Sequence, residues 1–452
     1  MGVSQNLSVE TGTDSGRFLN PAAFYPNRSD PLRMSLAQSA PAVIESRLPA
    51  RAWLVVALLC VVGGLNYLDR VMITTMRGSI VDAIPMTDTQ FGLLTAVFLW
   101  TYGILSPMAG FLADRFSRSR VIVGSLFIWS AVTLLTAYST TFGELLATRA
   151  LMGISEACYI PAALALIVDY HRGTTRSLAT GIHVGGMMLG QSLGFLGGVL
   201  AEQHTWSSAF QIFGVAGIAY AVVLIFFLRD APPQNQEVTS AVASQPTVHF
   251  GSALRNLFSR GSFLLALAFW GFLGMVGWLI IGWLPTYYKE HFQLPQGEAG
   301  LYATGYLHTA ALIGVLLGGA LADRWSRTNG RARLLLPAIG LLIAAPGVFL
   351  ASTTTILPIA VTGFVLYALT RTFSDANMMP ILCLITDSRY RATGYGVLNL
   401  FSCLVGGAGI YLGGILRDSH IDVSVLFRVA AGLMLLCAGI LFSIRIKPES
   451  LE

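Results

Sequence analysis

Long stretches of uncharged, mostly apolar residues dominate the pattern along this chain. Eight of them contain no Asp, Glu, Lys or Arg: 89–113, 121–143, 177–201, 203–228, 261–288, 299–322, 334–370 and 392–416. Four further apolar segments carry one or a few charges: 52–76, 142–167, 356–384 and 423–444. Because a helix of about 20 apolar residues crosses the hydrocarbon core of a bilayer, the pattern predicts twelve transmembrane helices, with the stretch 334–370 shared between two of them.

Composition supports an integral membrane protein. Hydrophobic residues make up 54% of the 452 residues and charged residues only 11%, against roughly 25% charged residues in soluble domains. This excludes a disordered chain, a coiled coil and an ordinary cytosolic enzyme. We expect residues 1–48 to form a polar, mobile tail, 49–228 and 257–446 to form two six-helix halves, 229–256 to form a polar linker between them, and 447–452 to form a second tail.

The basic residues predict how the helices are oriented. Lys and Arg are enriched in the cytoplasmic loops of membrane proteins. If both termini are cytoplasmic, 18 of the 28 basic residues lie in or beside inside segments, and the outside loops hold Arg77, Lys289 and Arg417. We therefore expect a multi-pass protein of the cell (inner) membrane with cytoplasmic termini. Anionic lipid headgroups on that side account for the net charge of +5 without any nucleic acid.

An internal repeat divides the chain into two related halves. The nine residues 110–118 and the nine residues 319–327 are identical at seven positions. A second repeat relates Glu156, five residues before Pro161, to Asp375, five residues before Pro380. The repeated polar turns contain Gly110, Asp114, Arg115, Arg118, Gly319, Asp323, Arg324 and Arg327.

Six of the charged residues inside predicted helices are expected to be buried in the membrane. They are Asp69, Arg70, Arg149, Glu156, Arg371 and Asp375, in the first, fourth and tenth helices. An ionisable group at the centre of a membrane helix costs about 2.5–3.5 kcal/mol or more, so it needs a partner or a water-filled cavity. These helices each begin a unit of three, and inverted three-helix repeats place such helices around a cavity at the midplane. A static buried ion network is the alternative explanation.

Two six-helix repeats with a G-x-x-x-D-R-x-x-R turn after the second helix of each half resemble the major facilitator superfamily, over residues 50–446. The resemblance implies an all-α membrane fold of 12 helices, alternating access, and a conformational latch formed by the two turns. The alternative interpretation is that the charges in these turns only fix the membrane topology.

Shorter motifs are similar to the anion:cation symporter branch of that superfamily, which includes proton-coupled carriers of sugar acids, hexuronates and other carboxylates. They are Asn66-Tyr67-Leu68-Asp69-Arg70, Arg149-Ala-Leu-Met-Gly153-Ile-Ser-Glu156-Ala157 and Trp283-Leu-Pro285-Thr-Tyr287. The resemblance implies that Asp69 and Glu156 carry protons and that Arg70 or Arg149 pairs with a substrate carboxylate. From these motifs and the other polar or aromatic residues of the predicted helices, including Arg371 and Asp375, which have no counterpart in the symporter pattern, we expect a substrate site formed by Asn66, Arg70, Tyr102, Arg149, His183, Trp283, Tyr287, His308, Arg371 and Asp375.

A second branch, the Spinster-like transporters of lysolipids and other amphiphiles, also resembles this chain. The resemblance rests on Asp69-Arg70, Phe98, Leu105-Ser-Pro107 and Arg149-x-x-x-Gly153-x-x-Glu156-Ala157. Both branches imply the same proton sites and differ in the cargo. A third hypothesis is a solute receptor with this fold that does not transport. The preferred expectation is proton-coupled symport of a small organic anion by a monomer.

The remaining signals argue against enzymatic chemistry. The chain has no G-x-x-x-x-G-K-[ST], H-E-x-x-H or G-x-S-x-G motif, so ATP-driven transport and hydrolysis have no support. Its five cysteines lie in apolar segments without C-x-x-C spacing. We expect no catalytic residue, no cofactor and no metal site. A neutral histidine bonded within the core is the ordinary alternative for His183 and His308.

Overall fold

The computed structural model describes residues 50–171, 175–232 and 250–444. The predicted tails, 1–48 and 447–452, lie outside the described residues, as does most of the predicted linker. Its last seven residues, 250–256, begin helix α12 (Phe250–Phe258), on which Ala253 and Leu257 are buried.

The described chain is helical, and twelve of its helical segments are long and apolar enough to cross a membrane. We number them as spans 1–12 in chain order. The first six are formed by α2 (Ala50–Thr75), α4 (Asp88–Arg115), α5 (Arg118–Thr136), α6–α7 (Phe142–Glu156 and Tyr159–Tyr170), α8–α9 (Arg176–Ser192 and Phe195–Gln203) and α10 (Trp206–Phe227). The last six are formed by α13 (Gly261–His291), α14–η1–α15 (Gln296–Gly300, Leu301–Tyr306 and Leu307–Ser326), α16 (Ala332–Thr353), α17–α18 (Leu357–Arg371 and Phe373–Ile385), α19 (Arg391–Asp418) and α20 (Val423–Ser443). Two short helices complete the fold, α3 (Arg77–Ala83) and η2 (Ser388–Tyr390).

The predicted number of spans is confirmed, including the division of the long apolar stretch 334–370 into α16 and α17. Large apolar side chains on the outer helix faces remain exposed, for example Phe226 at 67% and Leu316 at 65%. Apolar surface of this extent is rare on soluble monomers. It suits helices that face lipid.

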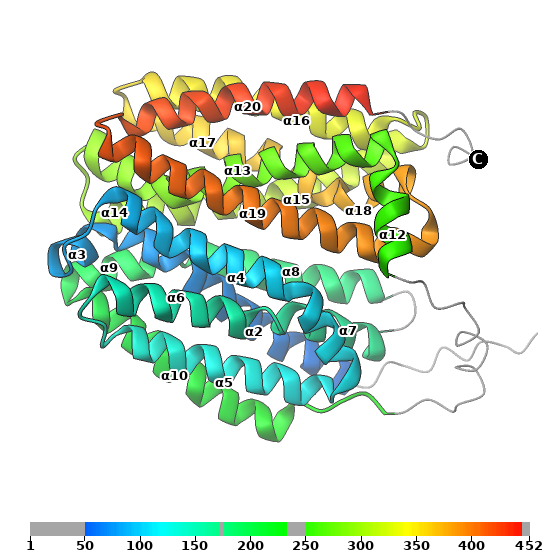
Figure 1. Ribbon diagram of the computed structural model, residues 1–452, viewed down its shortest axis with the longest axis horizontal. Helices are drawn as coiled ribbons and strands as arrows, with labels where there is room; N and C mark the ends of the chain where they lie inside the picture. The colour runs from blue at the N-terminus through cyan, green and yellow to red at the C-terminus, as the bar shows by residue number, and fades with distance from the viewer. Residues whose placement is uncertain (1–49, 172–174, 233–249, 445–452) are drawn as a thin grey trace, which may run out of the picture. The chain divides into compact units, whose positions relative to one another are not determined.

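The two halves lie against each other along their long helices (Figure 1), with the blue-to-green first half below and the green-to-red second half above. The α3 end carries α3, α9 and α14, and the α12 end is opposite. At the centre of the interface, α4 packs on α19. A side chain at Gly414 would approach the Asp88 carbonyl oxygen to 2.3 Å, and one at Gly103 would approach the Cys403 Cβ to 2.9 Å. Small residues therefore let these two helices meet from the α3 end to the middle.

Small residues also bring span 1 against span 5. A Cβ on Gly190 would lie 2.0 Å from the carbonyl oxygen of Gly64, and a Cβ on Gly63 would lie 2.8 Å from the Met187 Cγ. Gly64 and Gly190 therefore allow the two spans to pack closely. The contact holds the buried charges of span 1 in place.

Two spans are interrupted beside their charged residues. Span 4 is broken directly after Glu156, where α6 ends, and Pro161 lies in the first turn of α7. Proline cannot donate a backbone hydrogen bond but is tolerated in the first turn of a helix. Span 10 is broken at Thr372, between Arg371 and Asp375. The second sequence repeat thus corresponds to two broken helices, one in each half.

Candidate functional site

A buried ion pair joins spans 1 and 4. The Nε of Arg70 lies 2.7 Å from the Oε2 of Glu156, and both side chains are almost completely buried. The Arg70 guanidinium is also packed over three aromatic rings, with centroid distances of 4.4 Å to Tyr102, 4.7 Å to Tyr67 and 5.2 Å to Phe98. A planar guanidinium suits such stacking. Arg70 is therefore held by one carboxylate and an aromatic enclosure.

A second arginine lies close to this pair without an ion pair of its own. Arg149 is fully buried, stacks over Phe98 at 5.0 Å and donates from Nη1 to the sulfur of Met152. Its Nε and Nη2 have no hydrogen-bond partner among the described residues. A buried cation without a carboxylate partner is costly. Arg149 is thus a candidate for pairing with a group that arrives during function.

Asp69 completes the central cluster of Asp69, Arg70, Arg149 and Glu156. Thr133 of span 3 donates to its Oδ2 over 3.3 Å, and its Oδ1 has no partner in the described chain. The side chain is 2% exposed. Two carboxylates and two arginines from spans 1 and 4 therefore lie together, as the sequence predicts.

Two further predicted site residues lie beside this cluster, and a third, His183, lies against Tyr159. Tyr102 lies under Arg70, and Asn66 is fully buried on the same helix as Asp69. His183 is fully buried and meets the Tyr159 ring edge-on, at 5.9 Å between centroids. Asn66 and Tyr102 support the cluster from spans 1 and 2.

A cavity of about 410 Å³ lies between the halves. Its walls come from spans 1, 5, 7, 8, 10 and 11. They combine aromatic and apolar side chains with a few polar ones: Tyr67, Met187, Met188, Gln191, Trp270, Leu273, Trp278, Ile281, His308, Tyr367, Arg371, Asp375, Met378, Tyr395, Asn399 and Ser402. Tyr67 belongs to this wall and also stacks on Arg70. The cavity and the central cluster therefore share Tyr67.

Three predicted site residues line the cavity. Arg371 donates from Nη1 to the Oδ2 of Asp375 over 2.7 Å, across the break in span 10. Gly277 of span 7 allows this, because a Cβ there would lie 3.1 Å from the Arg371 Nη2. His308 of span 8 forms part of the same wall. The cavity thus holds an ion pair and an imidazole within a largely apolar surround.

Trp283 and Tyr287 lie elsewhere, towards the α3 end. Trp283 is fully buried and donates from Nε1 to the carbonyl oxygen of Ile410 over 3.2 Å. The Tyr287 hydroxyl donates to the carbonyl oxygen of Ala351 over 2.7 Å. Neither lines the cavity. Both hydrogen bonds join helices of the second half, span 7 to span 11 and span 7 to span 9.

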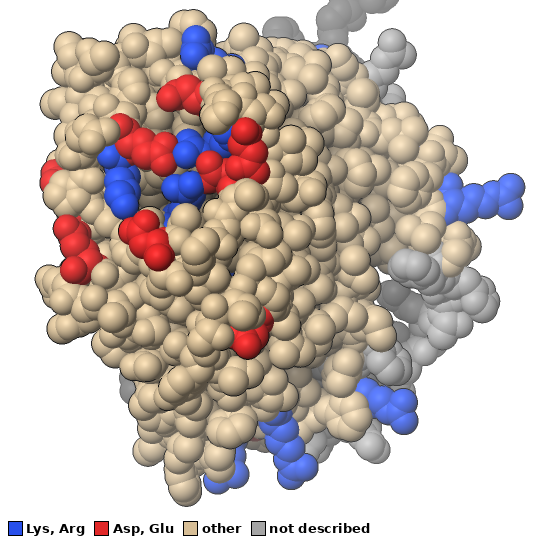
Figure 2. Space-filling model, turned by 60° about the vertical axis from the view of Figure 1, so that its left-hand side comes forward, with Lys and Arg blue, Asp and Glu red and all other residues tan. Residues whose placement is uncertain are grey.

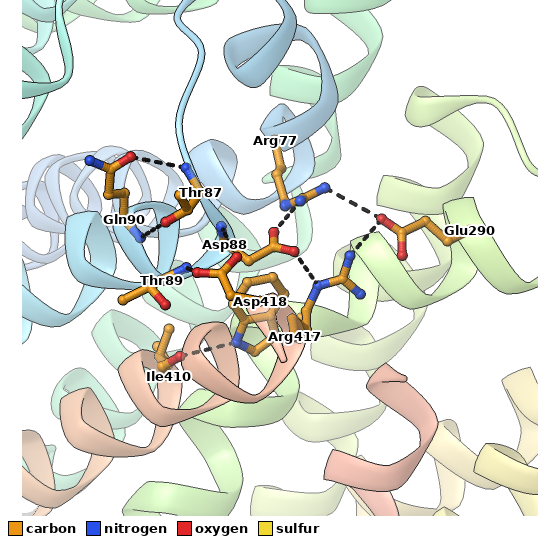
Figure 3. Close-up of polar contacts among 10 residues, drawn as sticks. Arg77, Thr87, Asp88, Thr89, Gln90, Glu290, Ile410, Arg417 and Asp418 are labelled. Carbon is orange, nitrogen blue, oxygen red and sulfur yellow. Dashed lines mark hydrogen bonds and ion pairs between the residues drawn. The ribbon is translucent and has the colours of Figure 1, made fainter. Parts of the chain in front are cut away.

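Four charged residues form a ring across the interface at the α3 end (Figure 3). Arg77 pairs with Asp88 of its own half and, over 3.4 Å, with Glu290 of the other half. Arg417 pairs over 2.9 Å with Glu290 and over 2.9 Å with Asp88. We call Arg77, Asp88, Glu290 and Arg417 the ionic ring. Asp418 reinforces it by accepting 2.9 Å bonds from the backbone N–H groups of Asp88 and Thr89.

The surface of this end shows the same clustering. Lys and Arg side chains gather in a hollow with Asp and Glu side chains around it (Figure 2). Alternating signs in a compact cluster give net attraction between the two halves. Sequence reasoning did not predict the ring. The sequence predicts only that two of its members, Arg77 and Arg417, lie in outside loops, since nothing local to either segment identifies a partner more than 200 residues away.

The partners seen for the repeated turns belong to the same half as the turn. Arg118 pairs with Asp169 of span 4 and donates to the carbonyl oxygen of Ala165 over 3.2 Å. Asp323 pairs over 3.0 Å with Arg333, which begins span 9. Arg115, Arg324 and Arg327 are exposed. The proposed latch between the turns therefore stays a prediction.

Comparison with known proteins now identifies the fold. The family model described as Major Facilitator Superfamily matches residues 59–410, with a second match over 278–452. The chain belongs to the Major Facilitator Superfamily. The predicted family and the predicted fold of 12 helices are both confirmed.

Relatives within this superfamily are transporters rather than enzymes. The chain is 30% identical over 388 residues to protein spinster homolog 1 of Bos taurus, covering 81% of this chain and 73% of that protein. It is 27% identical to an MFS-type efflux pump of Mycolicibacterium smegmatis, over 86% of this chain and 90% of that protein. It is 25% identical to a probable sulfoacetate transporter of Cupriavidus necator, over 87% of this chain and 94% of that protein. Both branches expected from the sequence are therefore represented.

A solved structure shares the fold. The crystal structure of a bacterial homolog to the human lysosomal transporter Spinster, in an inward-facing and unoccupied conformation, superposes with a TM-score of 0.72. It covers 88% of this chain and 99% of that chain at 23% sequence identity. The likeness concerns the fold alone.

Proposed function

We propose that this member of the Major Facilitator Superfamily is a secondary active, proton-coupled transporter of an amphiphilic organic molecule with an anionic group. One observation carries the choice of cargo. The cavity combines the Arg371–Asp375 pair with a wall of tryptophan, tyrosine and methionine side chains. Apolar walls with a few placed polar groups are typical of sites for small organic ligands.

The central cluster supports a separate coupling site. Glu156 and Asp69 are the carboxylates nearest the two buried arginines, and the Arg70 guanidinium is already bound to Glu156. Protonation of Glu156 removes that charge and frees the Arg70 guanidinium. Because Arg70 stacks on Tyr67, a change in the position of Arg70 reaches the cavity wall directly. This gives a path from proton binding to the cargo.

The direction of access follows from the ionic ring. The ring holds the two halves together at the α3 end, so the cargo enters and leaves from the α12 end in this conformation. With the termini on the cytoplasmic side, as the basic residues indicate, the ring faces outwards and the cavity inwards. We further propose a monomer in the cell membrane, with the two halves rocking about the cavity.

A second candidate cargo is a small organic anion such as a sugar acid or a sulfonate. Arg149 favours it, since this buried guanidinium has two nitrogens without partners. Similarity to the probable sulfoacetate transporter points the same way. On this alternative the anion is bound deeper, at Arg149, after Arg70 and Glu156 have separated.

Flux measurements with the full chain in proteoliposomes test the proposal. Radiolabelled lysophosphatidic acid, glucuronate and sulfoacetate are offered in parallel, each with and without an imposed pH gradient. The proposal expects accumulation of the lysolipid only with the gradient, and loss of this flux in Arg371→Gln but not in Arg333→Gln, whose ion pair with Asp323 is outside the cavity. Accumulation of glucuronate or sulfoacetate alone, abolished by Arg149→Gln, supports the second candidate. Binding without any flux supports a receptor.

A further inference from the structure

The ring of His308 has a fixed orientation at the cavity wall. Its Nδ1 lies 3.0 Å from the carbonyl oxygen of Thr304, one turn earlier on span 8. A carbonyl oxygen only accepts, so Nδ1 carries the proton and donates it. Nε2 lies on the opposite side of the ring and has no partner among the described residues. In the neutral imidazole that nitrogen is a hydrogen-bond acceptor.

The backbone that holds this histidine is itself restrained. Thr304 belongs to the π-helical turn η1, which ends directly before α15, and its hydroxyl donates over 3.0 Å to the carbonyl oxygen of Gly300. π-Helical turns are rare and occur often at functional sites. The side chain of His308 is only 4% exposed. An acceptor that is buried and without a partner costs free energy unless a ligand satisfies it.

The charged neighbour of His308 suits a ligand with two polar groups. Arg371 lines the same cavity as the imidazole. One of its nitrogens is held by Asp375, whereas its Nε has no partner in the described chain. The cavity wall therefore contains both an anion-binding donor and a hydrogen-bond acceptor, each held by other side chains or backbone.

We propose that Nε2 of His308 accepts a hydrogen bond from a hydroxyl or N–H group in the polar head of the cargo, while Arg371 binds the anionic group of the same head. The proposal rests on the amphiphilic cargo inferred above and adds a selection rule. An amphiphile whose head carries an anionic group and a nearby hydroxyl is preferred over the same molecule with that hydroxyl blocked.

Two matched ligands and two matched variants test this rule. The ligands are 1-oleoyl lysophosphatidic acid, which has a free 2-hydroxyl, and its 2-O-methyl ether, which has no donor there. His308→Asn retains an amide nitrogen near the position of Nδ1 and loses the acceptor. His308→Gln loses the bond to Thr304 but can place its amide oxygen near the position of Nε2. Binding to the full chain in nanodiscs is followed by quenching of tryptophan fluorescence, since Trp270 and Trp278 line the cavity.

We expect the wild-type protein to bind the alcohol about five- to tenfold more tightly than the ether, which is the range for one hydrogen bond. His308→Gln should keep this preference, and His308→Asn should reduce the ratio of the two dissociation constants to about one. If His308 has only a structural role, His308→Asn should keep the wild-type ratio of dissociation constants and His308→Gln should lose it. Equal binding of both ligands by the wild type, or an unchanged ratio in His308→Asn, overturns the selection rule while the amphiphilic cargo stands. If neither ligand binds, both the selection rule and the proposal of an amphiphilic cargo are overturned.

Discussion

Arg417 and Asp88 lie on different halves of the chain and are joined by a 2.9 Å ion pair between Nε and Oδ2. Their side chains are only 12% and 14% exposed. Each is bound a second time within the ionic ring, Arg417 by Glu290 and Asp88 by Arg77. Separation of the halves at this end therefore breaks both pairs that cross the interface, Arg417–Asp88 and Arg77–Glu290. The ring is suited to stabilise one conformation over the other.

Removing the Arg417–Asp88 ion pair should shift the protein towards a conformation that is open at the α3 end. A partly exposed ion pair contributes up to about 1 kcal/mol, so Arg417→Ala should raise the open population about fivefold. Spin labels at Tyr138→Cys and Thr355→Cys, in a background without the native cysteines, report the distance between the halves by pulsed electron paramagnetic resonance. Arg333→Ala, which removes an ion pair within one half, is the control. An unchanged distance distribution in Arg417→Ala would show that the ring does not set the conformation.

Substitution of the buried carboxylates should separate proton coupling from cargo exchange. Asp69→Asn and Glu156→Gln keep the shape of the side chain but cannot release a proton, so accumulation driven by a pH gradient should disappear while exchange of labelled for unlabelled cargo continues. Both fluxes are measured in proteoliposomes. Asp82→Asn, at an exposed position on α3, should leave both unchanged.

The two carboxylate variants should differ in stability. Glu156→Gln leaves the buried Arg70 without its anionic partner, which costs about 3–5 kcal/mol in comparable cases. Asp69 has no ion pair within 4 Å among the described residues, so Asp69→Asn should lower the melting temperature less. Thermal unfolding in detergent measures the difference. Normal pH-driven accumulation by both variants would contradict the assignment of the proton sites.

Close packing of span 4 on span 2 should depend on Gly153. A Cβ there would lie 2.6 Å from the carbonyl oxygen of Phe98 and 2.1 Å from the Thr101 Oγ1. Gly153→Ala should therefore destabilise the protein by about 1–3 kcal/mol, the usual cost of overpacking. Gly143→Ala on the same helix meets nothing within 4 Å, and it should be neutral or slightly stabilising. Equal melting temperatures for the two variants would contradict the packing shown here.

The position of Arg371 in the cavity should depend on Gly277. A methyl group at this site would approach the Arg371 Nη2 to 3.1 Å, so Gly277→Ala should displace the guanidinium by a few tenths of an ångström. We expect the dissociation constant for lysophosphatidic acid to rise about threefold with little change in melting temperature, because the end of an arginine side chain can move. Gly439→Ala, in open space on span 12, is the matched control. Undiminished affinity in Gly277→Ala would place the anionic group of the ligand away from Arg371.

Much of the fold is a local property and can be predicted from the sequence. The length of each apolar stretch determines whether it crosses a bilayer, so the twelve spans follow from the pattern alone. The repeated turns and the paired Glu156 and Asp375 motifs indicate the duplication. The cost of a buried charge predicts that Asp69, Arg70, Arg149 and Glu156 lie together.

The tertiary structure decides which charges pair and what they face. Arg70 and Glu156 are 86 residues apart, and their 2.7 Å contact depends on how spans 1 and 4 rotate about their axes. The same packing places Arg371, Asp375 and His308 on the cavity wall, whereas Trp283 and Tyr287 are at the closed end. The ionic ring joins loops that are distant in sequence and exists only because the two halves meet there. A hydrophobic pattern specifies how long a helix is but not its neighbours, since lipid and protein interior are equally apolar.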